Sequence, residues 1–315
     1  MAETSLNRFM LLSLVAAVVT IVLKSVAYAL TGSVGLLSDA AESGVNLMAA
    51  CTGLLSLWYS SRPVDTSHAY GHEKIEFFAS GLEGMFIVLA AGGIAWYAVT
   101  RLIAPQPIES IETGLVISFI AGLINLGVGQ LLLRVGRARG SIVLEADGQH
   151  LMADVWTNVA VLVGLILVRL TGIRELDPLC GLGVAILIVW TGFDLMRRSF
   201  NGLMDHSLPE GEQALVRSTI KAQLEPGMDF HALRTRMAGS HRFADCHLLV
   251  PGRLNVQAAH DVAERIEEAV RTALPGMEVT VHIEPIEEKA AWTDSALVPL
   301  ELATREAEQA KPGTA

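Results

Sequence analysis

Six long apolar stretches before about residue 200 limit what this chain can fold into. They run approximately from Phe9 to Leu30, Val34 to Tyr59, Phe77 to Ile103, Thr113 to Val135, Val143 to Leu170 and Leu179 to Met196. Each is close to the roughly 20 residues that an α-helix needs to cross the hydrocarbon core of a bilayer. Hydrophobic residues make up 51% of the chain and charged residues only 18%, too apolar for an ordinary soluble protein. We therefore predict an α-helical membrane protein with six transmembrane helices.

Lys and Arg near the ends of these stretches fall mostly on alternate connections. One side carries Arg8, Arg62, Lys74, Arg134, Arg137, Arg139, Arg197 and Arg198, and the other chiefly Arg101, Arg169 and Arg174. The positive-inside rule makes the first side cytoplasmic, together with both termini. The first stretch contains Lys24 and lacks a clear small-residue cleavage site, which favours a membrane anchor over a signal peptide. We expect a multi-pass protein of a bacterial inner membrane.

Hydropathy falls sharply after Asn201, where the pattern becomes that of a small soluble domain. The predicted elements are a helix over 209–224, strands over 231–237 and 242–250, a helix over 256–274 and a strand over 278–284. This order, αββαβ, indicates a small cytoplasmic α+β domain of ferredoxin-like or metallochaperone-like type. The expected regions are therefore 1–206 in the membrane, 207–288 in the soluble domain and 289–315 in a disordered tail.

Cysteine usage and charge exclude several classes of protein. Cys51, Cys180 and Cys246 show no C-x-x-C spacing, which argues against a disulfide framework or a thiolate zinc site. The formal net charge of −10, without a basic patch, argues against a nucleic-acid partner.

The acidic and histidine residues inside the apolar stretches carry the strongest functional signal, because ionisable groups in a membrane are costly. Two stretches share one spacing: Asp39, Glu42 and Asn46, and Asp147, His150 and Asp154. In each set the three residues fall on one helical stripe. Two such helices, packed together, can supply a four-coordinate metal site. The predicted ligands are Glu42, Asn46, His150 and Asp154, with Asp39 as a candidate helper.

A lone intramembrane His or Asn is more often an interhelical hydrogen-bonding group than a ligand. The matching stripes on two helices favour the metal site. Imidazole and oxygen donors suit Zn, Fe, Co or Mn, whereas Cu(I) prefers thiolates.

These features jointly resemble the cation diffusion facilitator family of proton-coupled metal exporters. The resemblance covers nearly the whole chain. It rests on the six stretches, Ser38-Asp39-Ala40, His150-x-x-x-Asp154, His68-Ala-Tyr-Gly-His72-Glu-Lys, Asp177-Pro178 and the αββαβ order. It implies a homodimer in the lipid bilayer that alternates between inward-open and outward-open states and moves divalent metal out against protons. It also implies that the soluble domain binds metal and contributes to dimerisation.

The second stretch departs from the pattern of the family, whose members commonly have His or Asp where this chain has Glu42 and Asp where it has Asn46. An amide keeps an oxygen donor but removes one negative charge, so we expect weaker metal binding and altered competition with protons. Asp39 is a candidate to compensate. Because an unperturbed imidazole titrates near about pH 6.5, His150 is suited to hold metal and proton in turn.

Two further metal sites are expected outside the membrane. Asp65, His68 and His72 lie in one loop, where two histidines four apart can share a metal. Taken without the resemblance, a solvated polar loop explains them equally well. The resemblance implies the cytoplasmic ligands His231, His247, His260, His282 and Glu284. It also suggests an ion pair between Lys74 and Asp205.

Two other functional classes compete with transport. A membrane metalloenzyme needs an open water position and a general base beside its metal, and no H-E-x-x-H motif is present. A membrane-anchored metal sensor or scaffold with little transport would bind metal in the soluble domain. The intramembrane ligands argue against it. The sequence thus predicts a non-enzymatic exporter of divalent metal that works by metal/proton antiport.

Overall fold

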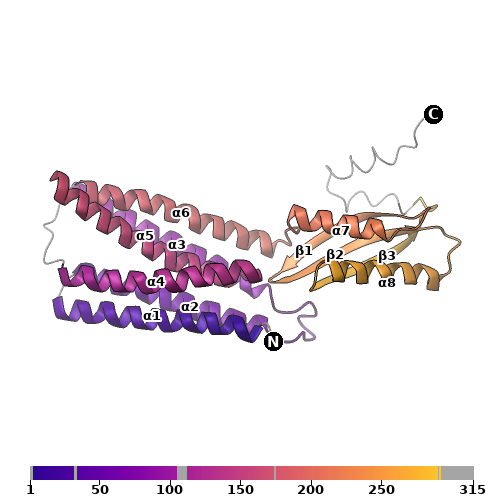
Figure 1. The fold of residues 1–315 in the computed structure, drawn as a ribbon, viewed down its shortest axis with the longest axis horizontal. Helices are drawn as coiled ribbons and strands as arrows, with labels where there is room; N and C mark the ends of the chain where they lie inside the picture. The colour runs from indigo at the N-terminus through magenta and orange to yellow at the C-terminus, as the bar shows by residue number, and fades with distance from the viewer. Residues whose placement is uncertain (1–2, 32–33, 105–111, 174, 290, 292–315) are drawn as a thin grey trace, which may run out of the picture. The chain divides into compact units, whose positions relative to one another are not determined.

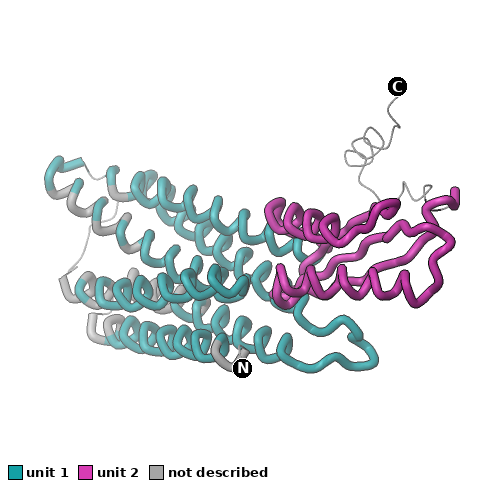
Figure 2. Tube along the Cα trace, turned by 45° about the vertical axis from the view of Figure 1, so that its right-hand side comes forward, with its two compact units in different colours: residues 1–204 teal, residues 205–315 magenta. Residues whose placement is uncertain are grey.

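The computed structural model describes the backbone of residues 3–31, 34–104, 112–173, 175–289 and 291 (Figure 1). The chain divides into two compact units, residues 1–204 and residues 205–315 (Figure 2). The side chains of Asp39, Glu42 and Asp177 lie outside the described part. Of the predicted tail, all but residues 289 and 291 lies outside it as well.

The first unit consists of six long helices that lie side by side (Figure 1). They are α1 (Glu3–Thr31), α2 (Val34–Ser60), α3 (Ile75–Ile103), α4 (Glu112–Arg139), α5 (Ile142–Thr171) and α6 (Leu176–Leu203). Among the described residues, α1, α3, α4 and α6 contain segments long and apolar enough to cross a membrane. The helices α2 and α5 have comparable lengths of 27 and 30 residues and carry the polar stripes. All six predicted stretches are therefore helical.

Small residues let the helices of this unit approach closely. A Cβ atom on Gly84 of α3 would lie 3.0 Å from the carbonyl oxygen of Gly192 in α6, and the reverse distance is also 3.0 Å. Gly129 of α4 and Gly148 of α5 face each other in the same way, at 3.3 and 3.1 Å. Such glycine pairs are typical of packed membrane helices, where backbone proximity replaces the hydrophobic effect. The second pair holds α4 against the part of α5 that carries the predicted ligands.

The first unit is apolar outside and partly polar inside. Large apolar side chains such as Leu89, Trp96, Ile186 and Trp190 are exposed on it, as expected of a surface in contact with lipid. Its interior buries the polar side chains Asn46, Glu83, Asn125, Asp147, His150 and Asp154. This distribution marks the interior as the place where the chemistry of the unit lies.

The second unit confirms the predicted αββαβ order. Its elements are α7 (Glu210–Ala222), β1 (Asp229–Ala238), β2 (His241–Val250), α8 (Val256–Ala273) and β3 (Met277–Pro285). The sheet has the order β1-β2-β3, with β1 antiparallel and β3 parallel to the central β2. A parallel neighbour requires a crossover, which α8 provides.

Periodicity explains how this unit buries its core. The side chain of Asn255 caps α8 by accepting a hydrogen bond from the backbone N–H of Ala258. The helix then buries Ala259, Val262, Ala263, Ile266 and Val270 along one stripe. On β2, Cys246, Leu248 and Val250 belong to the same core. Because side chains alternate along a strand, His247 lies on the opposite face of the sheet.

Candidate metal sites

Asn46 of α2 and Asp154 of α5 meet in the interior of the helical unit, where they are 3% and 5% exposed. The Asn46 amide donates a hydrogen bond to Oδ2 of Asp154. The amide of Asn125 in α4 donates to the same oxygen over 3.1 Å. One carboxylate oxygen thus collects two neutral donors from two helices. Asp39 and Glu42, the other predicted members from α2, lie outside the described side chains.

His150 lies one helical turn before Asp154 on α5 and is 3% exposed. Its Nδ1 atom is 3.6 Å from Oε1 of Glu83 in α3, and both side chains are buried. Asp147, one turn earlier on α5, is also buried, at 2% exposure. The interior therefore holds ionisable side chains from α3 as well as from α5.

Several potential ligand atoms in this interior lack a hydrogen-bond partner among the described residues. They are Oδ1 of Asn46, Oε1 of Glu83, Oδ1 of Asn125, Oδ2 of Asp147 and Nδ1 of His150. A buried polar atom left unpaired costs about 1–3 kcal/mol, so such atoms rarely gather without a reason. All five are of types that bind cations or protons. The chemistry of this donor set fits a divalent metal ion as a bound substrate.

Glu83 and Asn125 were missed by the prediction from sequence. Glu83 is an ionisable residue within the third apolar stretch, and the rule that such residues are functional would have found it. Asn125 is a single amide in the fourth stretch, for which an interhelical hydrogen bond is the ordinary expectation. Its contact with Asp154 requires the packing of α4 against α5.

The loop between α2 and α3 brings Asp65, His68 and His72 together, with one ligand atom of each lying within 4.8 Å of the others. Asp65 Oδ1 is 3.1 Å from His68 Nδ1, and its Oδ2 is 3.2 Å from His72 Nε2. The imidazole of His72 is buried and packs edge-on against Tyr59. Gly71 supplies the positive φ of 93° that turns the chain between the two histidines. This loop therefore holds three ligand-type groups in an ordered arrangement.

Asp65 is stabilised in its ionised form. The backbone N–H groups of Ser67 and His68 donate to its Oδ1 over 2.8 and 2.7 Å. The hydrogen bond from His68 is the largest cause that lowers the pKa of Asp65 below its ordinary value. The carboxylate is thus held ready as an anionic ligand.

A second cluster lies on the sheet of the other unit, on the face away from its helices. The register places His231 of β1 opposite His247 of β2, and His247 beside His282 of β3. Glu284, two residues after His282, projects from the same face. One ligand atom from each of His231, His247 and Glu284 lies within 4.8 Å of the others.

Glu284 is the common partner of the three histidines. Its carboxylate oxygens lie 3.0 Å from His231 Nε2, 3.4 Å from His247 Nδ1 and 3.6 Å from His282 Nε2. His282 is 65% exposed, whereas the other three side chains are largely buried. The sheet thus brings one carboxylate and three imidazoles together on one face.

Three other predicted residues lie elsewhere. His260 is exposed on α8, where its Nε2 is 3.5 Å from Glu264. Asp205 lies 3.6 Å from the guanidinium of Arg236. Lys74 belongs to the other unit, so its pairing with Asp205 stays a prediction.

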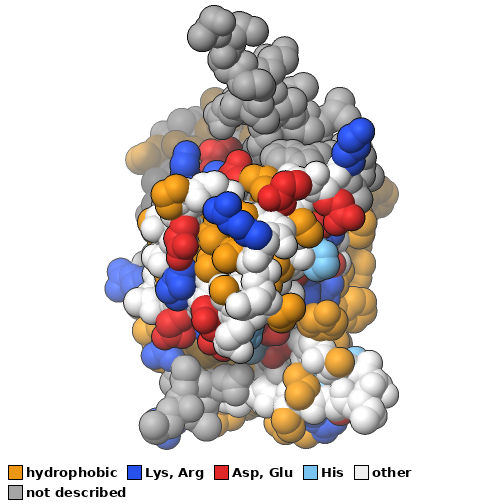
Figure 3. Space-filling view, turned by 90° about the vertical axis from the view of Figure 1, so that its right-hand side faces the viewer, with side chains coloured by type: hydrophobic (Ala, Val, Ile, Leu, Met, Phe, Trp, Pro, Cys, Tyr) orange, Lys and Arg blue, Asp and Glu red, His pale blue; other side chains and the backbone are white. Residues whose placement is uncertain are grey.

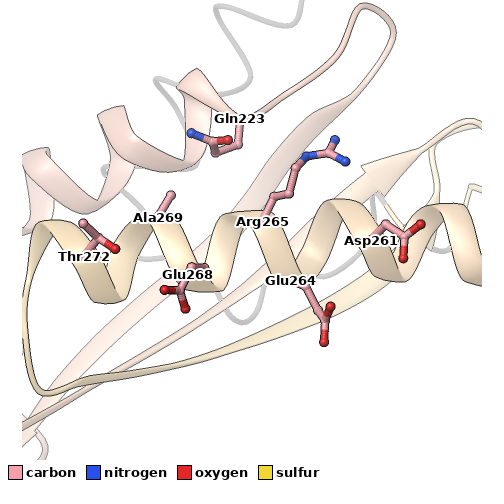
Figure 4. A pocket seen from close by; sticks show the side chains of 7 residues that line it. All are labelled: Gln223, Asp261, Glu264, Arg265, Glu268, Ala269 and Thr272. Atoms are coloured by element: carbon pink, nitrogen blue, oxygen red, sulfur yellow. The ribbon is translucent and has the colours of Figure 1, made fainter.

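Among the described residues, one further surface feature is a pocket whose side chains do not converge as ligands. A shallow pocket between α7 and α8 is lined by Gln223, Asp261, Glu264, Arg265, Glu268, Ala269 and Thr272 (Figure 4). Arg265 is neutralised by Glu225 over 2.7 Å. Figure 4 shows Glu264 and Glu268 pointing away from Gln223 rather than towards a common centre. Figure 3 shows a face on which acidic, basic and apolar side chains are interspersed.

Known proteins resemble this chain along most of its length. Residues 10–204 match the family described as the cation efflux transmembrane domain, and residues 208–286 match the cytoplasmic domain of cation efflux proteins. An uncharacterised transporter of Synechocystis sp. is 45% identical over 90% of this chain and 92% of the relative. The cation-efflux pump FieF of Cronobacter sakazakii is 31% identical over 89% of this chain and 92% of the pump. A solved structure of CzrB in its zinc form is 34% identical and covers 27% of this chain and 97% of that chain, with a TM-score of 0.26.

The first match spans more than half of the chain and contains the buried residues from Asn46 to Asp154. The relatives are bacterial transporters, which agrees with a multi-pass protein of the inner membrane. The chain belongs to the cation diffusion facilitator family of cation efflux transporters, as the sequence predicted.

Proposed function

We propose that this protein exports a divalent transition-metal cation, Zn, Fe, Co or Mn, from the cytoplasm in exchange for protons. The observation that carries the proposal is that α2 and α5 bury Asn46, His150 and Asp154 in the interior of the helical unit, where Oδ1 of Asn46 and Nδ1 of His150 lack a hydrogen-bond partner among the described residues. A cation bound there would interact with the buried atoms that make no hydrogen bond to the other described side chains. The name of the FieF relatives, cation-efflux pump, supports the direction of transport.

Proton exchange follows from the chemistry of the ligands. Imidazole binds metal only when it is unprotonated, and carboxylates bind metal in their ionised form. A cation that arrives from the cytoplasm therefore displaces protons from His150 and the nearby carboxylates. When the site opens to the outside, protonation of the same groups releases the metal. Alternating access of this kind requires at least two states of the helical unit, one open to each side.

We further propose that the protein acts as a homodimer and that the two clusters outside the membrane are metal sites. The match of residues 208–286 to the cytoplasmic domain of cation efflux proteins supports a role for this unit in assembly. The Asp65 loop (Asp65, His68 and His72) and the Glu284 cluster (His231, His247 and Glu284) each combine imidazole with carboxylate. This ligand set is suited to zinc and similar ions. Cytoplasmic metal bound at the Glu284 cluster would act as a regulator of the dimer.

A transport assay tests the main proposal. The protein is reconstituted into vesicles that contain a metal-sensitive dye, and a pH gradient is imposed. We expect metal flux that depends on the gradient and is lost in Asp154→Ala and His150→Ala. Flux that persists in both variants would refute the assignment of the site. Flux without accompanying proton movement would refute antiport.

The Glu284 cluster also favours a second function, that of a membrane-anchored metal sensor. The variant Glu284→Ala distinguishes the two, because a transporter retains some flux without its regulatory site. A sensor shows no flux in the wild type and loses its metal response in this variant.

A further inference from the structure

We propose that Glu83 of α3 is a positioning residue of the transmembrane metal site, which orients His150 and supplies a negative charge that Asn46 lacks. The inference rests on the proposed transport function and adds a third helix to the α2 and α5 pair. No motif in the sequence singled out this residue.

The first support is the geometry of the contact. Oε1 of Glu83 lies 3.6 Å from Nδ1 of His150, and each side chain is 4% exposed. Both atoms lack a hydrogen-bond partner among the described residues. A separation of 3.6 Å is too long for a hydrogen bond but short enough for a strong electrostatic interaction in a buried setting. A small movement of α3 against α5 would shorten this separation to hydrogen-bonding distance.

The second support is the chemistry of metal-binding histidines. Such a residue generally donates its other ring N–H to a carboxylate, a backbone carbonyl or a water, which fixes the tautomer and the orientation of the ring. With Nδ1 of His150 facing Glu83, Nε2 is the nitrogen that remains for the cation. Glu83 therefore acts through His150, without itself needing to touch the metal.

The third support is the contrast with an ordinary structural ion pair. Glu145, also on α5, pairs with Arg198 of α6 at 3.0 Å, and this pair is complete in itself. Within the described part of the chain, the ion pair of Glu83 is with His150. This buried carboxylate is poorly compensated, because a neutral imidazole brings no positive charge and the buried carboxyl group of Asp147 also acts on it unfavourably. A divalent cation beside His150 would supply that charge.

Charge balance explains why this chain would need Glu83. Asn46 supplies an amide in the predicted ligand set, so its carboxylates are limited to Glu42 and Asp154. A carboxylate on α3 adds negative charge to the same interior without occupying a ligand position on α2. The amide of Asn46 meanwhile remains free of like-charge repulsion against Asp154.

The test measures metal flux in vesicles against metal concentration, with Zn²⁺ and Mn²⁺ as the probes. In Glu83→Gln, which keeps the size of the side chain, we expect KM to rise by about tenfold with kcat changed by less than about threefold. Ser80→Ala is the matched control, because Ser80 is fully buried one turn earlier on α3 and, among the described residues, its hydroxyl donates to the backbone carbonyl of Glu76 in the same helix. We expect the control to keep the wild-type KM.

A second-site variant separates charge from packing. In the Glu83→Gln background, the carboxylate added by Asn46→Asp should lower KM at least about threefold more than the same substitution does in the wild-type background. A purely structural role for Glu83 predicts that the effects of the two substitutions on KM simply add. The inference is overturned if Glu83→Gln matches the wild type, if Ser80→Ala is equally impaired, or if the two substitutions act additively. Loss of flux in the wild type itself would instead refute the proposed function.

Discussion

The amide of Asn46 in α2 donates a hydrogen bond to the carboxylate of Asp154 in α5, so the two polar stripes are joined by a neutral donor and an acceptor. An aspartate at position 46 could not make this bond unless one of the two carboxyl groups were protonated. The same carboxylate also accepts from Asn125. Asp154 is therefore hydrogen-bonded to two amides, and position 46 contributes no negative charge.

Asn46→Asp should consequently bind divalent metal more tightly, by about tenfold, because a second carboxylate faces the cation. It should also release more protons on binding, because two adjacent carboxylates share a proton when no metal is present. Calorimetric titration in two buffers of different ionisation enthalpy measures both quantities.

Asn46→Ala provides the comparison, because it removes the oxygen donor and adds no charge. We expect it to bind more weakly than the wild type. Equal or weaker binding by Asn46→Asp would show that Asn46 lies outside the coordination sphere.

Much of the fold could be predicted because its elements have clear periods and ends. Helical length and hydropathy define the six stretches, and alternation with a turn near Gly239 defines β1 and β2. The row formed by His231, His247 and His282 depends on strand register, which the pattern of buried residues on the other face largely fixes. The position of these histidines side by side on one face of the sheet was accordingly accessible to sequence reasoning.

The missed contacts depend on how whole helices are rotated against one another. The position of Glu83 beside His150 requires the orientation of α3 around its own axis, which spacing along α5 does not contain. The contact of Asn125 with Asp154 likewise depends on the packing of Gly129 against Gly148. Sequence spacing relates residues of one helix, whereas both of these contacts join two helices.

The Asp65 carboxylate should stay ionised over the physiological pH range. Metal binding in the loop should therefore not depend on a change in its protonation. Its pKa is lowered in the folded protein, so its stabilising effect is present above the ordinary pKa and is lost only as pH falls through the lower folded value. Between about pH 8 and 5 the carboxylate therefore stays ionised. Any loss of metal from the loop in this window must come from protonation of imidazole nitrogen atoms.

Asp65→Asn should accordingly weaken binding by about tenfold throughout this range, because it removes an anionic ligand at every one of these pH values. The measurement is the visible absorption of Co²⁺ in a background of Asp154→Ala and Glu284→Ala. Ser67→Ala is the control, since its backbone N–H still donates to Asp65. Binding by Asp65→Asn as tight as that of the wild type would contradict the role of Asp65 as a ligand.

Glu284 should contribute more to the cytoplasmic site than any single histidine, because it is within 3.6 Å of three of them. Glu284→Ala should weaken zinc binding by at least about tenfold and leave three imidazoles without their common acceptor. The measurement is equilibrium zinc binding by the full-length protein in detergent with Asp154→Ala in the background. His241→Ala, an exposed substitution at the start of β2 in the same sheet, is the control. Equal losses in the two variants would exclude a specific site.

Cys246 should report the opening of the cytoplasmic unit. Burial is the main cause that raises the pKa of its thiol to about 12, and the nearby carboxylates of Asp245 and Glu267 add to it. Because the thiolate is the reactive form, native Cys246 should react very slowly with iodoacetamide at about pH 8. Cys51→Ser and Cys180→Ser remove the other thiols, so that labelling reports this position alone.

Ile266→Ala should then accelerate the labelling of Cys246. Ile266 is fully buried in the same core, and its truncation should lower the free energy of unfolding of this unit by about 2–5 kcal/mol. When labelling proceeds through opening of the unit, even the lower value raises the rate by about twentyfold or more. Val256→Ala, on the same helix but 86% exposed, should leave the rate unchanged. If Ile266→Ala also leaves it unchanged, the thiol reacts through a local path that does not require the core to open.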